Sequence, residues 1–336
     1  MNTYIKNIST YLPDTIITNA DLRLKNPSWD FLNIENKTGV LERRVVETNQ
    51  TALDLAIRAC DALFLNEPED LSNIDAIFFC TQSPDYIMPS NSHLLHKHLK
   101  LDDDVMAFDY NLACSGFVYG LGIAHAFIKA NMAKNILLVT SETYSKFINP
   151  KDRSAITLFG DGCAATLISA TQEDKGIIDL ELSTHGKGHG KFCIPAGGMR
   201  TPLTEKTKVE ITDSSGNIRS QENIHMDGFG VWSFINSVIP KQILNVLSRN
   251  EIELKDIDQF IFHQASKMTI DSLVKSLKLD VEKVFLNMGN KGNTVSATIP
   301  IALREAEDQR RIKRGDKILL CGFGVGFSYG TLLMDY

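Results

Sequence analysis

Four segments of the chain carry residues suited to nucleophilic acyl chemistry, and the first contains Cys114. Cys114 lies between a short strand expected over 105–108 and a long apolar helix that begins just after Ser115 and Gly116. The unpaired N–H groups at a helix N-terminus stabilise negative charge, which favours the thiolate, the nucleophilic form of cysteine. The structural alternative is a small cysteine that fills a buried turn, since free cysteine is among the most buried residue types.

The other three segments each follow an expected strand. His263 ends the segment FIFHQAS, Asn293 lies in GNKGNTVSA at the start of a helix, and 322–326 is glycine-rich. Ligands of α/β sheets bind beyond the carboxyl ends of strands, so these loops are expected to converge with the loop of Cys114. The structural alternatives are a core histidine at His263 and a helix N-cap at Asn293.

The glycine-rich segment CGFGVGF is not a dinucleotide-binding fingerprint. No helix follows it, and the chain ends before an acidic residue about 20 positions later. Backbone N–H groups that face an oxyanion fit this segment better.

Composition narrows the classes of protein. The chain has 336 residues, of which 43% are hydrophobic and 23% charged, so it is long enough for one large or two medium domains. A net charge of −6 argues against broad nucleic-acid binding. No apolar run reaches the roughly 18 residues of a membrane-spanning helix, and no signal-peptide pattern is present. A cytoplasmic protein without membrane contact is therefore expected.

Neither a metal site nor a disulfide framework is expected. The six cysteines are spread along the chain without a CxxC pair. His185 and His189, in HGKGH, are interpreted as solvated residues of a glycine-rich loop, because no third ligand is near them in sequence.

Strands and helices are expected to alternate along the chain, which implies sheets covered by helices on their faces. Strands are expected over 4–11, 74–80, 105–108, 135–140, 164–169, 177–183, 260–262, 284–287, 317–321 and 328–334. Helices are expected to begin near 18–21 and after 116, and to cover 51–65, 91–99, 231–249, 269–277 and 294–306, the last kinked by Pro300. The segment 26–38 is expected to be irregular, and 184–227 to be an excursion over the surface.

The two halves of the chain resemble each other. The segment 72–83 is similar to 255–266 at an offset of 183, and 159–162 is similar to 323–326 at an offset of 164. Two matches in the same order indicate a duplicated βα unit, with halves at 1–172 and 173–336. In this register His263 takes the place of Cys80 at the end of equivalent strands.

Taken together, the motifs resemble β-ketoacyl-acyl carrier protein synthase III, the condensing enzyme that starts fatty-acid chains, within the thiolase-like superfamily. The resemblance runs nearly end to end and rests on YLPDTIITNADL, KTGVLERR, ACSGF, DRSAITLFGDGCAA, HQA, GNTVSA and GFGVGFSYG. It implies a duplicated thiolase-like α/β fold, in which two similar βα halves have helices layered between and outside two mixed sheets. This fold agrees with the internal repeat.

The resemblance also implies a mechanism. Cys114 would take an acyl group from a thioester donor, while the backbone N–H groups of Cys114 and Val325 hold the oxyanion. A malonyl thioester would then lose CO₂, with His263 and Asn293 donating hydrogen bonds to its thioester oxygen. Attack of the resulting carbanion on the acyl-cysteine gives a 3-ketoacyl thioester. No bound cofactor is implied, and the substrates are thioesters of CoA or of the phosphopantetheine group of acyl carrier protein.

Further site residues follow from the same resemblance. Phe323 and Met226 are expected in the substrate pocket, and Met88 is expected to reach into the acyl pocket of a partner subunit in a homodimer. The residues expected to bind CoA or the carrier protein are Lys37, Arg153, Trp29, Lys267 and Lys275.

This chain departs from the family pattern around the pocket. Trp29 is about four residues out of register, and Ser266 stands where an asparagine is usual. Ser233 and Met268 occupy positions that are basic in relatives. These changes favour a specialised relative that uses a carrier-protein thioester or an unusual acyl group rather than acetyl-CoA.

Four alternatives remain open at the level of sequence. A related acyl transfer on the same scaffold would form an ester or an amide. A non-decarboxylating condensation uses a glutamate after the IDAIFFC strand, where this chain has Thr81, Gln82 and Ser83. A papain-like hydrolase has the same Cys, His, Asn order, but the duplicated pattern argues against it. A non-enzymatic partner subunit usually lacks the cysteine, which this chain keeps.

Overall fold

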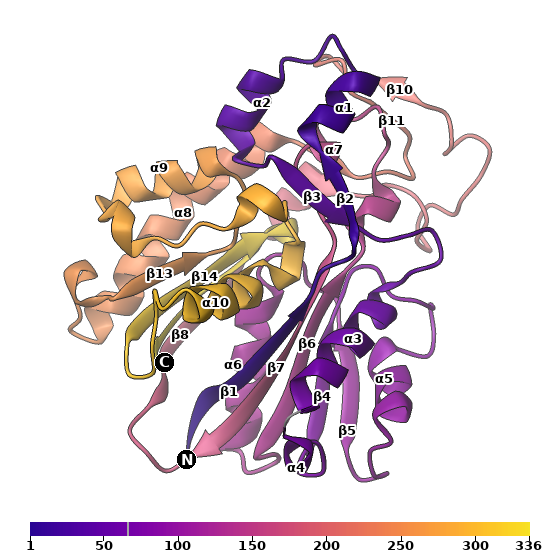
Figure 1. Ribbon diagram of the computed structural model, residues 1–336. Helices are drawn as coiled ribbons and strands as arrows, with labels where there is room; N and C mark the ends of the chain where they lie inside the picture. The colour runs from indigo at the N-terminus through magenta and orange to yellow at the C-terminus, as the bar shows by residue number, and fades with distance from the viewer. Residues whose placement is uncertain (66) are drawn as a thin grey trace.

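Two main sheets, one from each half of the chain, form the framework of the protein (Figure 1). The computed structural model describes residues 1–65 and 67–336. The first sheet has the order β1-β7-β6-β4-β5, with β1 (Asn2–Tyr11), β4 (Ala76–Cys80), β5 (Met106–Tyr110), β6 (Asn135–Glu142) and β7 (Gly162–Thr171). The second has the order β8-β15-β14-β13, with β8 (Gly176–Thr184), β13 (Gln259–Phe262), β14 (Lys317–Gly324) and β15 (Ser328–Asp335).

The two sheets repeat the same pairing pattern. Strands β1, β7 and β6 pair antiparallel, and β6, β4 and β5 pair parallel. Strands β8, β15 and β14 likewise pair antiparallel, and β14 and β13 pair parallel. The duplicated α/β fold expected from the repeat is therefore confirmed. The expected boundary at residues 172 and 173 falls in the segment that joins β7 to β8.

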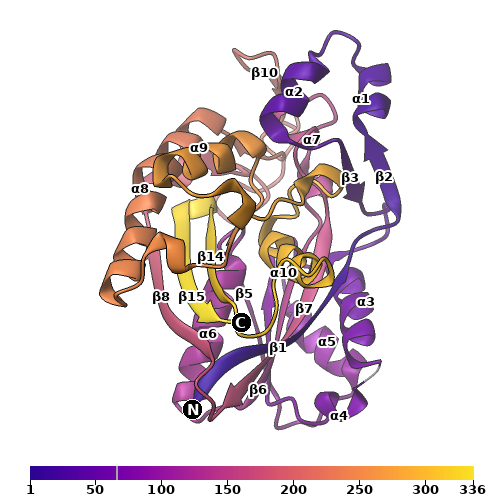
Figure 2. The ribbon, with the colours of Figure 1, turned by 60° about the vertical axis from the view of Figure 1, so that its left-hand side comes forward.

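Helices lie between and outside the sheets (Figures 1 and 2). The central helices α6 (Gly116–Lys129) and α10 (Thr298–Asp308) contact strands of both sheets. On the outer side of the first sheet lie α3 (Ala52–Phe64) and α5 (Asn91–Leu99), with the short α4 (Pro68–Leu71) against α3. Helix α8 (Gly228–Arg249) covers the second sheet and packs against α9 (Lys267–Leu277).

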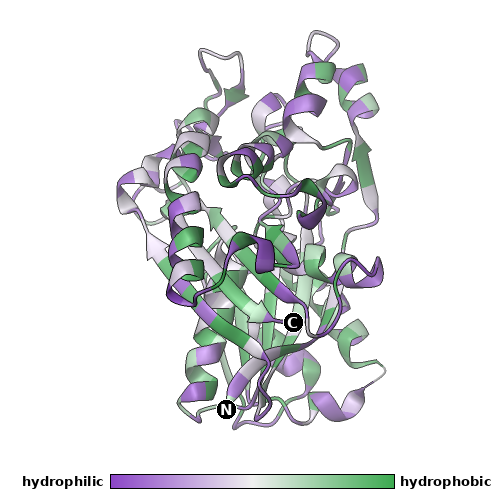
Figure 3. Cartoon of the chain, turned by 90° about the vertical axis from the view of Figure 1, so that its left-hand side faces the viewer, coloured by the Kyte–Doolittle hydropathy of each residue, from purple (hydrophilic) through white to green (hydrophobic). Residues whose placement is uncertain are grey.

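The strands are apolar on both faces because helices cover both faces. Successive side chains of a strand point to opposite sides, so in β4 Ala76 and Phe78 join the core between the sheets. Ile77 and Phe79 join the core under α3 and α5. This two-sided burial explains the continuous apolar run AIFFC of β4, and other inner strands are likewise coloured as hydrophobic in Figure 3.

Three expectations about secondary structure are wrong. The segment 26–38 is not irregular, because α2 (Phe31–Thr38) forms there, with Asp30 accepting a hydrogen bond from the N–H of Asn33. The strand expected over 284–287 is reduced to one parallel bridge between Phe260 and Val284, at the place where β5 pairs with β4 in the first half. Pro300 causes no interruption, because α10 begins only two residues earlier and the missing N–H lies in the unpaired first turn.

Smaller elements cover the carboxyl ends of the central strands. Near the N-terminus, α1 (Asn19–Lys25) follows β2 (Thr15–Thr18), which pairs with β3 (Glu42–Val45). In the second half, the excursion over 184–227 contains two pairs of short antiparallel strands. Strand β9 (Phe192–Cys193) pairs with β12 (His225–Met226), and β10 (Ile211–Thr212) pairs with β11 (Ile218–Arg219). Of these, only β10 and β11 form a hairpin.

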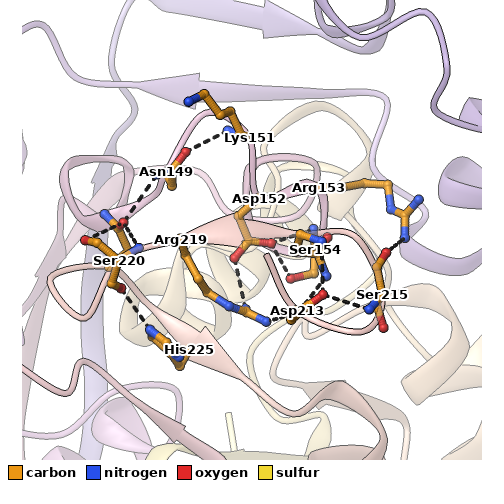
Figure 4. Close-up of polar contacts among 12 residues, drawn as sticks. Asn149, Lys151, Asp152, Arg153, Ser154, Asp213, Ser215, Arg219, Ser220 and His225 are labelled. Atoms are coloured by element: carbon orange, nitrogen blue, oxygen red, sulfur yellow. Dashed lines mark hydrogen bonds and ion pairs between the residues drawn. The ribbon is translucent and has the colours of Figure 1, made fainter. Parts of the chain in front are cut away.

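The excursion is fastened to the first half through an ion-pair cluster (Figure 4). The guanidinium of Arg219, in β11, lies between the carboxylates of Asp213 and Asp152, the latter at 3.0 Å. Asp152 is buried and caps α7 (Arg153–Ile156) by accepting the N–H of Ser154. The hairpin of β10 and β11 is therefore held over α7, beside the cavity described below.

Candidate active site

Cys114 lies where the two halves of the molecule meet. It follows β5, immediately precedes the first turn of α6, and is only 3% exposed. Helix α6 packs closely on the first sheet, since a Cβ atom at Gly116 would lie 2.3 Å from Sγ of Cys80. From the other half, the end of β14 covers the cysteine, and a Cβ atom at Gly324 would lie 2.9 Å from Sγ of Cys114. The expected glycine-rich turn is thus partly strand, because β14 continues through Gly324.

Gly324→Ala is expected to reduce acylation of Cys114 at least about tenfold while the protein stays folded. The added methyl group would also lie 2.7 Å from Cβ of Cys114, closer than real Cβ contacts allow. The rate is measured by quenching the reaction at successive times and quantifying the acyl-enzyme by mass spectrometry. Gly198→Ala is the matched control, because a Cβ atom there meets nothing within 4 Å. An unchanged acylation rate in Gly324→Ala would show that the covering strand does not restrict the sulfur.

His263 and Asn293 lie together on the side of the second half. His263 directly follows β13, and its Nε2 is 3.4 Å from Nδ2 of Asn293. The amide of Asn293 is oriented, because its Oδ1 accepts the N–H of Val295 at 2.9 Å. Asn293 therefore makes a hydrogen bond like that of a helix N-cap, the structural role considered in the sequence analysis. Its NH₂ group still faces His263.

The first half holds Asn293 in place. Its N–H donates to the carbonyl of Leu158 at 2.9 Å, and its carbonyl accepts from the N–H of Gly160 at 3.0 Å. These partners belong to the DRSAITLFGDG segment. That segment is therefore a support for the site as well as a sequence signature.

Burial decides the charge states of the two titratable side chains. Burial, with a contribution from nearby Glu142, raises the pKa of Cys114 well above its ordinary value. Burial therefore outweighs the stabilisation that the helix N-terminus offers a thiolate, and it favours the thiol form of Cys114. Burial lowers the pKa of His263 to about 3, so its imidazole is neutral at physiological pH.

A buried carboxyl group lies behind Cys114. Glu142 is fully buried and accepts hydrogen bonds from the N–H of Gln82 at 3.0 Å and from the hydroxyl of Ser296 at 2.9 Å. Burial raises the pKa of Glu142 to about 8 despite these hydrogen bonds. The group is therefore mostly protonated at neutral pH.

Glu142 is expected to make stability fall as pH rises from about 4.5 to about 8. In this window the folded chain holds a proton on Glu142 that the unfolded chain has lost, so unfolding releases a proton. The effect is on the order of a few kcal/mol, since one pKa unit corresponds to about 1.4 kcal/mol. Melting curves at pH 5 and pH 8 should show a larger loss for the wild type than for Glu142→Gln. Equal losses would contradict a raised pKa.

Two backbone N–H groups are free to bind an oxyanion. Within residues 1–65 and 67–336, the N–H groups of Cys114 and Val325 donate to no other residue. Val325 directly follows Gly324, the residue that packs against the side chain of Cys114. Buried N–H groups normally have partners, so these two are available to an acceptor on a ligand, such as an oxyanion.

An open cavity of about 190 Å³ leads from the surface to Cys114. His263, Asn293 and Phe323 line its inner end, with the rings of His263 and Phe323 edge to face at 5.6 Å. Two other expected residues, Lys37 and Met226, line it farther out.

The residues expected to bind CoA or the carrier protein are not all brought together. Arg153 lines a smaller neighbouring cavity, which it shares with Lys37. Trp29 instead packs against Phe31, with ring centroids 6.1 Å apart. Lys267 and Lys275 lie on α9 and line neither cavity.

Sequence reasoning missed most of the apolar wall of the main cavity. The missed lining residues are Leu158, Phe159, Phe192, Val231, Trp232 and Ile235. Val231, Trp232 and Ile235 belong to the first two turns of α8, and Trp232 is one of only two tryptophans in the chain. The sequence signal for this cavity wall was a tryptophan near the start of a helix that follows a long excursion.

A second cavity of about 180 Å³, called the inner cavity below, is lined in part by Phe192 and Val325. Gln82, Asn111 and Tyr144 form its polar side, where Nε2 of Gln82 donates to Oδ1 of Asn111 at 2.7 Å and the hydroxyl of Tyr144 donates to Gln82. Phe192 lines both cavities, so the two lie on either side of one side chain.

A thiol at the head of a buried helix, facing a neutral histidine and an amide from a second, matching half, is the arrangement of thiolase-like acyltransferases. The two equivalent sheets place the chain in that class. Comparison with known proteins then defines the family. The family description "3-Oxoacyl-[acyl-carrier-protein (ACP)] synthase III" matches residues 108–186, and its C-terminal counterpart matches residues 247–336.

Individual relatives agree over the whole chain. The sequence is 32% identical to β-ketoacyl-[acyl-carrier-protein] synthase III of Fusobacterium nucleatum over 99% of this chain and 98% of that one. It is 36% identical to the protein of the same name from Caldanaerobacter subterraneus, over 99% and 97% of the two chains. A 2.1 Å crystal structure of a 3-oxoacyl-(acyl-carrier-protein) synthase III, 35% identical, superposes with a TM-score of 0.97 over 100% of both chains. This chain belongs to the β-ketoacyl-acyl carrier protein synthase III family.

Neither a metal-binding cluster nor a membrane-spanning helix occurs in the described part of the chain. Across residues 1–65 and 67–336, no group of three or more histidine, cysteine, aspartate or glutamate side chains is placed to hold a metal ion. In the same part of the chain, no helix has the length and apolar character needed to cross a membrane.

Proposed function

The chain is a condensing acyltransferase of this family, and we propose that Cys114, His263 and Asn293 carry its chemistry. Cys114 attacks the carbonyl of an acyl thioester and becomes acylated, and the free N–H groups of Cys114 and Val325 hold the oxyanion. The observation that carries this proposal is the convergence of Cys114, His263 and Asn293 at the inner end of one open cavity.

The second half-reaction uses the same cavity. A malonyl thioester enters after the first thiol has left, and its thioester oxygen accepts hydrogen bonds from Nδ2 of Asn293 and Nε2 of His263. These donors stabilise the enolate that remains when CO₂ leaves. The carbanion attacks the acyl-cysteine and gives a 3-ketoacyl thioester. The reaction needs no bound cofactor.

We infer that the substrates are thioesters of CoA or of acyl carrier protein, held along the main cavity. The curated relatives are named synthases of the acyl-carrier-protein system, which supports a carrier protein as the partner. Lys37 and Arg153 face the small cavity beside the mouth and are suited to a phosphate group. Lys267 and Lys275 on α9 carry positive charges that are suited to contact the acidic surface of a carrier protein. Trp29 would add an aromatic surface to this contact.

Homodimer formation is part of the proposal. The loop before α5 exposes Tyr86, Ile87 and Met88, the last at 79%, and large apolar side chains in one exposed loop are typical of protein contacts. In a dimer Met88 of each chain would close the partner's inner cavity, which opens beside Asn111. Sedimentation equilibrium should give twice the chain mass of 37.4 kDa. We also infer a cytoplasmic location, where the carrier protein and CoA thioesters are found.

Product analysis tests the proposed reaction. The protein is incubated with malonyl-carrier protein and a panel of acyl-CoA and acyl-carrier-protein donors, and the products are identified by mass spectrometry. The proposal expects release of CO₂ and a carrier-bound 3-ketoacyl product from at least one donor. A product joined through an ester or amide bond, without loss of CO₂, would instead identify a related acyl transfer on the same scaffold.

A further inference from the structure

The Nδ1 atom of His263 has one partner in the site, the hydroxyl group of Thr298. The distance from Nδ1 to Oγ1 of Thr298 is 2.7 Å, and both side chains are buried. Thr298 is the first residue of α10, and its hydroxyl also donates to the carbonyl of Val295 at 3.0 Å. Because that hydrogen is used, Oγ1 of Thr298 is left as an acceptor for an N–H at Nδ1.

Val295 links Thr298 to Asn293. Its φ of +56° lies in the left-handed region, which is rare and strained for a β-branched residue. This conformation directs the N–H of Val295 to Oδ1 of Asn293 and its carbonyl to the hydroxyl of Thr298. One strained residue thus orients the groups that contact both the amide and the imidazole of the site.

The contact with Asn293 favours the same ring tautomer. Nδ2 of Asn293 is a donor that faces Nε2 of His263 at 3.4 Å. Two N–H donors facing each other without an acceptor between them would be unfavourable, so in the resting site Nε2 presents its lone pair. A neutral imidazole with its hydrogen on Nδ1 satisfies Thr298 and Asn293 together.

We propose that Thr298 is a positioning residue, which accepts a hydrogen bond from Nδ1–H of His263 and thereby makes Nε2 the ring nitrogen that exchanges protons with Cys114. This proposal rests on the proposed function. In acylation, a C–S bond to Cys114 forms and the C–S bond to the donor breaks. The thiol proton moves from Cys114 to Nε2 and then to the departing thiolate, so no net proton is released.

The same arrangement balances the condensation. The condensation consumes one proton, because the sulfur of Cys114 leaves as a thiolate when its C–S bond to the acyl group breaks. Nε2, which carries no proton in the unliganded site, takes this proton from solvent while the bound malonyl anion stabilises the resulting imidazolium, and as Nε2–H it donates to the thioester oxygen. As the new C–C bond forms, the C–S bond to Cys114 breaks and this proton passes to the sulfur. Thr298 keeps the hydrogen on Nδ1 throughout.

The decisive variants are Thr298→Val and Thr298→Ser. Valine keeps the shape and removes the acceptor, and we expect it to slow acylation of Cys114 at least about tenfold, because a positioned proton acceptor contributes about 10²–10⁴-fold. Serine restores the acceptor and should return the rate to within about threefold of the wild type. A residue with a purely structural role would not need a hydroxyl oxygen for this rescue.

Thr331→Val is the matched control. Thr331 is equally buried, lies in β15, and donates its hydroxyl to Oε1 of Gln242 at 3.0 Å, away from the cavity. Its loss should leave the acylation rate unchanged. Acylation of folded Thr298→Val at the wild-type rate would overturn the proposal, whether or not the condensation slows. Absence of a Cys114 adduct in the wild type would instead overturn the proposed function.

If Thr298→Val does not fold, ¹⁵N NMR spectroscopy of the wild type still tests the proposal. ¹⁵N chemical shifts distinguish protonated from unprotonated ring nitrogens, and comparison with His263→Asn assigns the signals of His263 in the wild type. We expect Nδ1 protonated and Nε2 unprotonated in the unliganded enzyme. A protonated Nε2 beside an unprotonated Nδ1 would show that Thr298 donates to the ring, and the proposal would be wrong.

Discussion

Cys114→Ala is expected to abolish the acyl-enzyme and to lower the rate of condensation by at least about 10³-fold, the scale seen when a catalytic nucleophile is removed. The cysteine is the only thiol that lines the main cavity within residues 1–65 and 67–336. Alanine leaves space rather than adding bulk, so the fold should survive. Intact-mass analysis after incubation with acyl donors measures the loss of the adduct.

Cys193→Ala is the control for this substitution. Cys193 is half-buried and lines the inner cavity, so it is the other thiol that a reactive thioester can approach. Its removal should leave both the adduct and the condensation rate close to those of the wild type. An adduct that persists in Cys114→Ala and disappears in Cys193→Ala would contradict the assignment of the nucleophile.

Asn293→Ala should separate the two half-reactions. Cys114 should still become acylated, whereas the condensation with malonyl thioester should slow by about 10²–10³-fold, the effect of losing one donor to a developing oxyanion. The amide is suited to this role, because its oxygen is occupied by the N–H of Val295 and its NH₂ group faces the cavity. Single-turnover discharge of a preformed acyl-enzyme measures the second step alone.

Two further variants sharpen this test. Asn293→Asp keeps an oxygen for Val295 but replaces the donor with a negative charge, so the discharge should be slower than in Asn293→Ala. Asn290→Ala changes an exposed asparagine nearby, whose Oδ1 accepts from Nζ of Lys291, and should have no effect. Equal slowing of acylation and discharge in Asn293→Ala would argue against an amide that acts mainly on the enolate.

Much of the fold was predictable because burial on both faces of a sheet leaves a plain pattern. The strand β4 is apolar throughout, with the sequence AIFFC, and the similarity of 72–83 to 255–266 indicated the duplication. Helix α5 (Asn91–Leu99) has the expected bounds, since its amphipathic spacing and polar flanks are local features. The approach of Cys114, His263 and Asn293 followed from the rule that ligands of α/β sheets bind beyond the carboxyl ends of strands.

The remaining features depend on contacts between distant segments. Residues 284–287 are apolar enough for a strand, but only Val284 pairs, so local pattern was misleading. The neutral states of Cys114 and His263 come from burial by both halves, which spacing along the chain does not show. Likewise, the left-handed conformation of Val295 is imposed by its surroundings, against its own preference.

The central claim is that Cys114 carries the acyl group that is then joined to a malonyl-derived carbon. Intact-mass spectrometry tests it most directly: the enzyme is loaded from a panel of acyl-CoA and acyl-carrier-protein donors, freed of donor, and mixed with malonyl-carrier protein. We expect an adduct of the acyl mass on Cys114 that disappears as CO₂ and a 3-ketoacyl-carrier product form. An adduct at Cys114 that malonyl-carrier protein leaves in place would contradict this account.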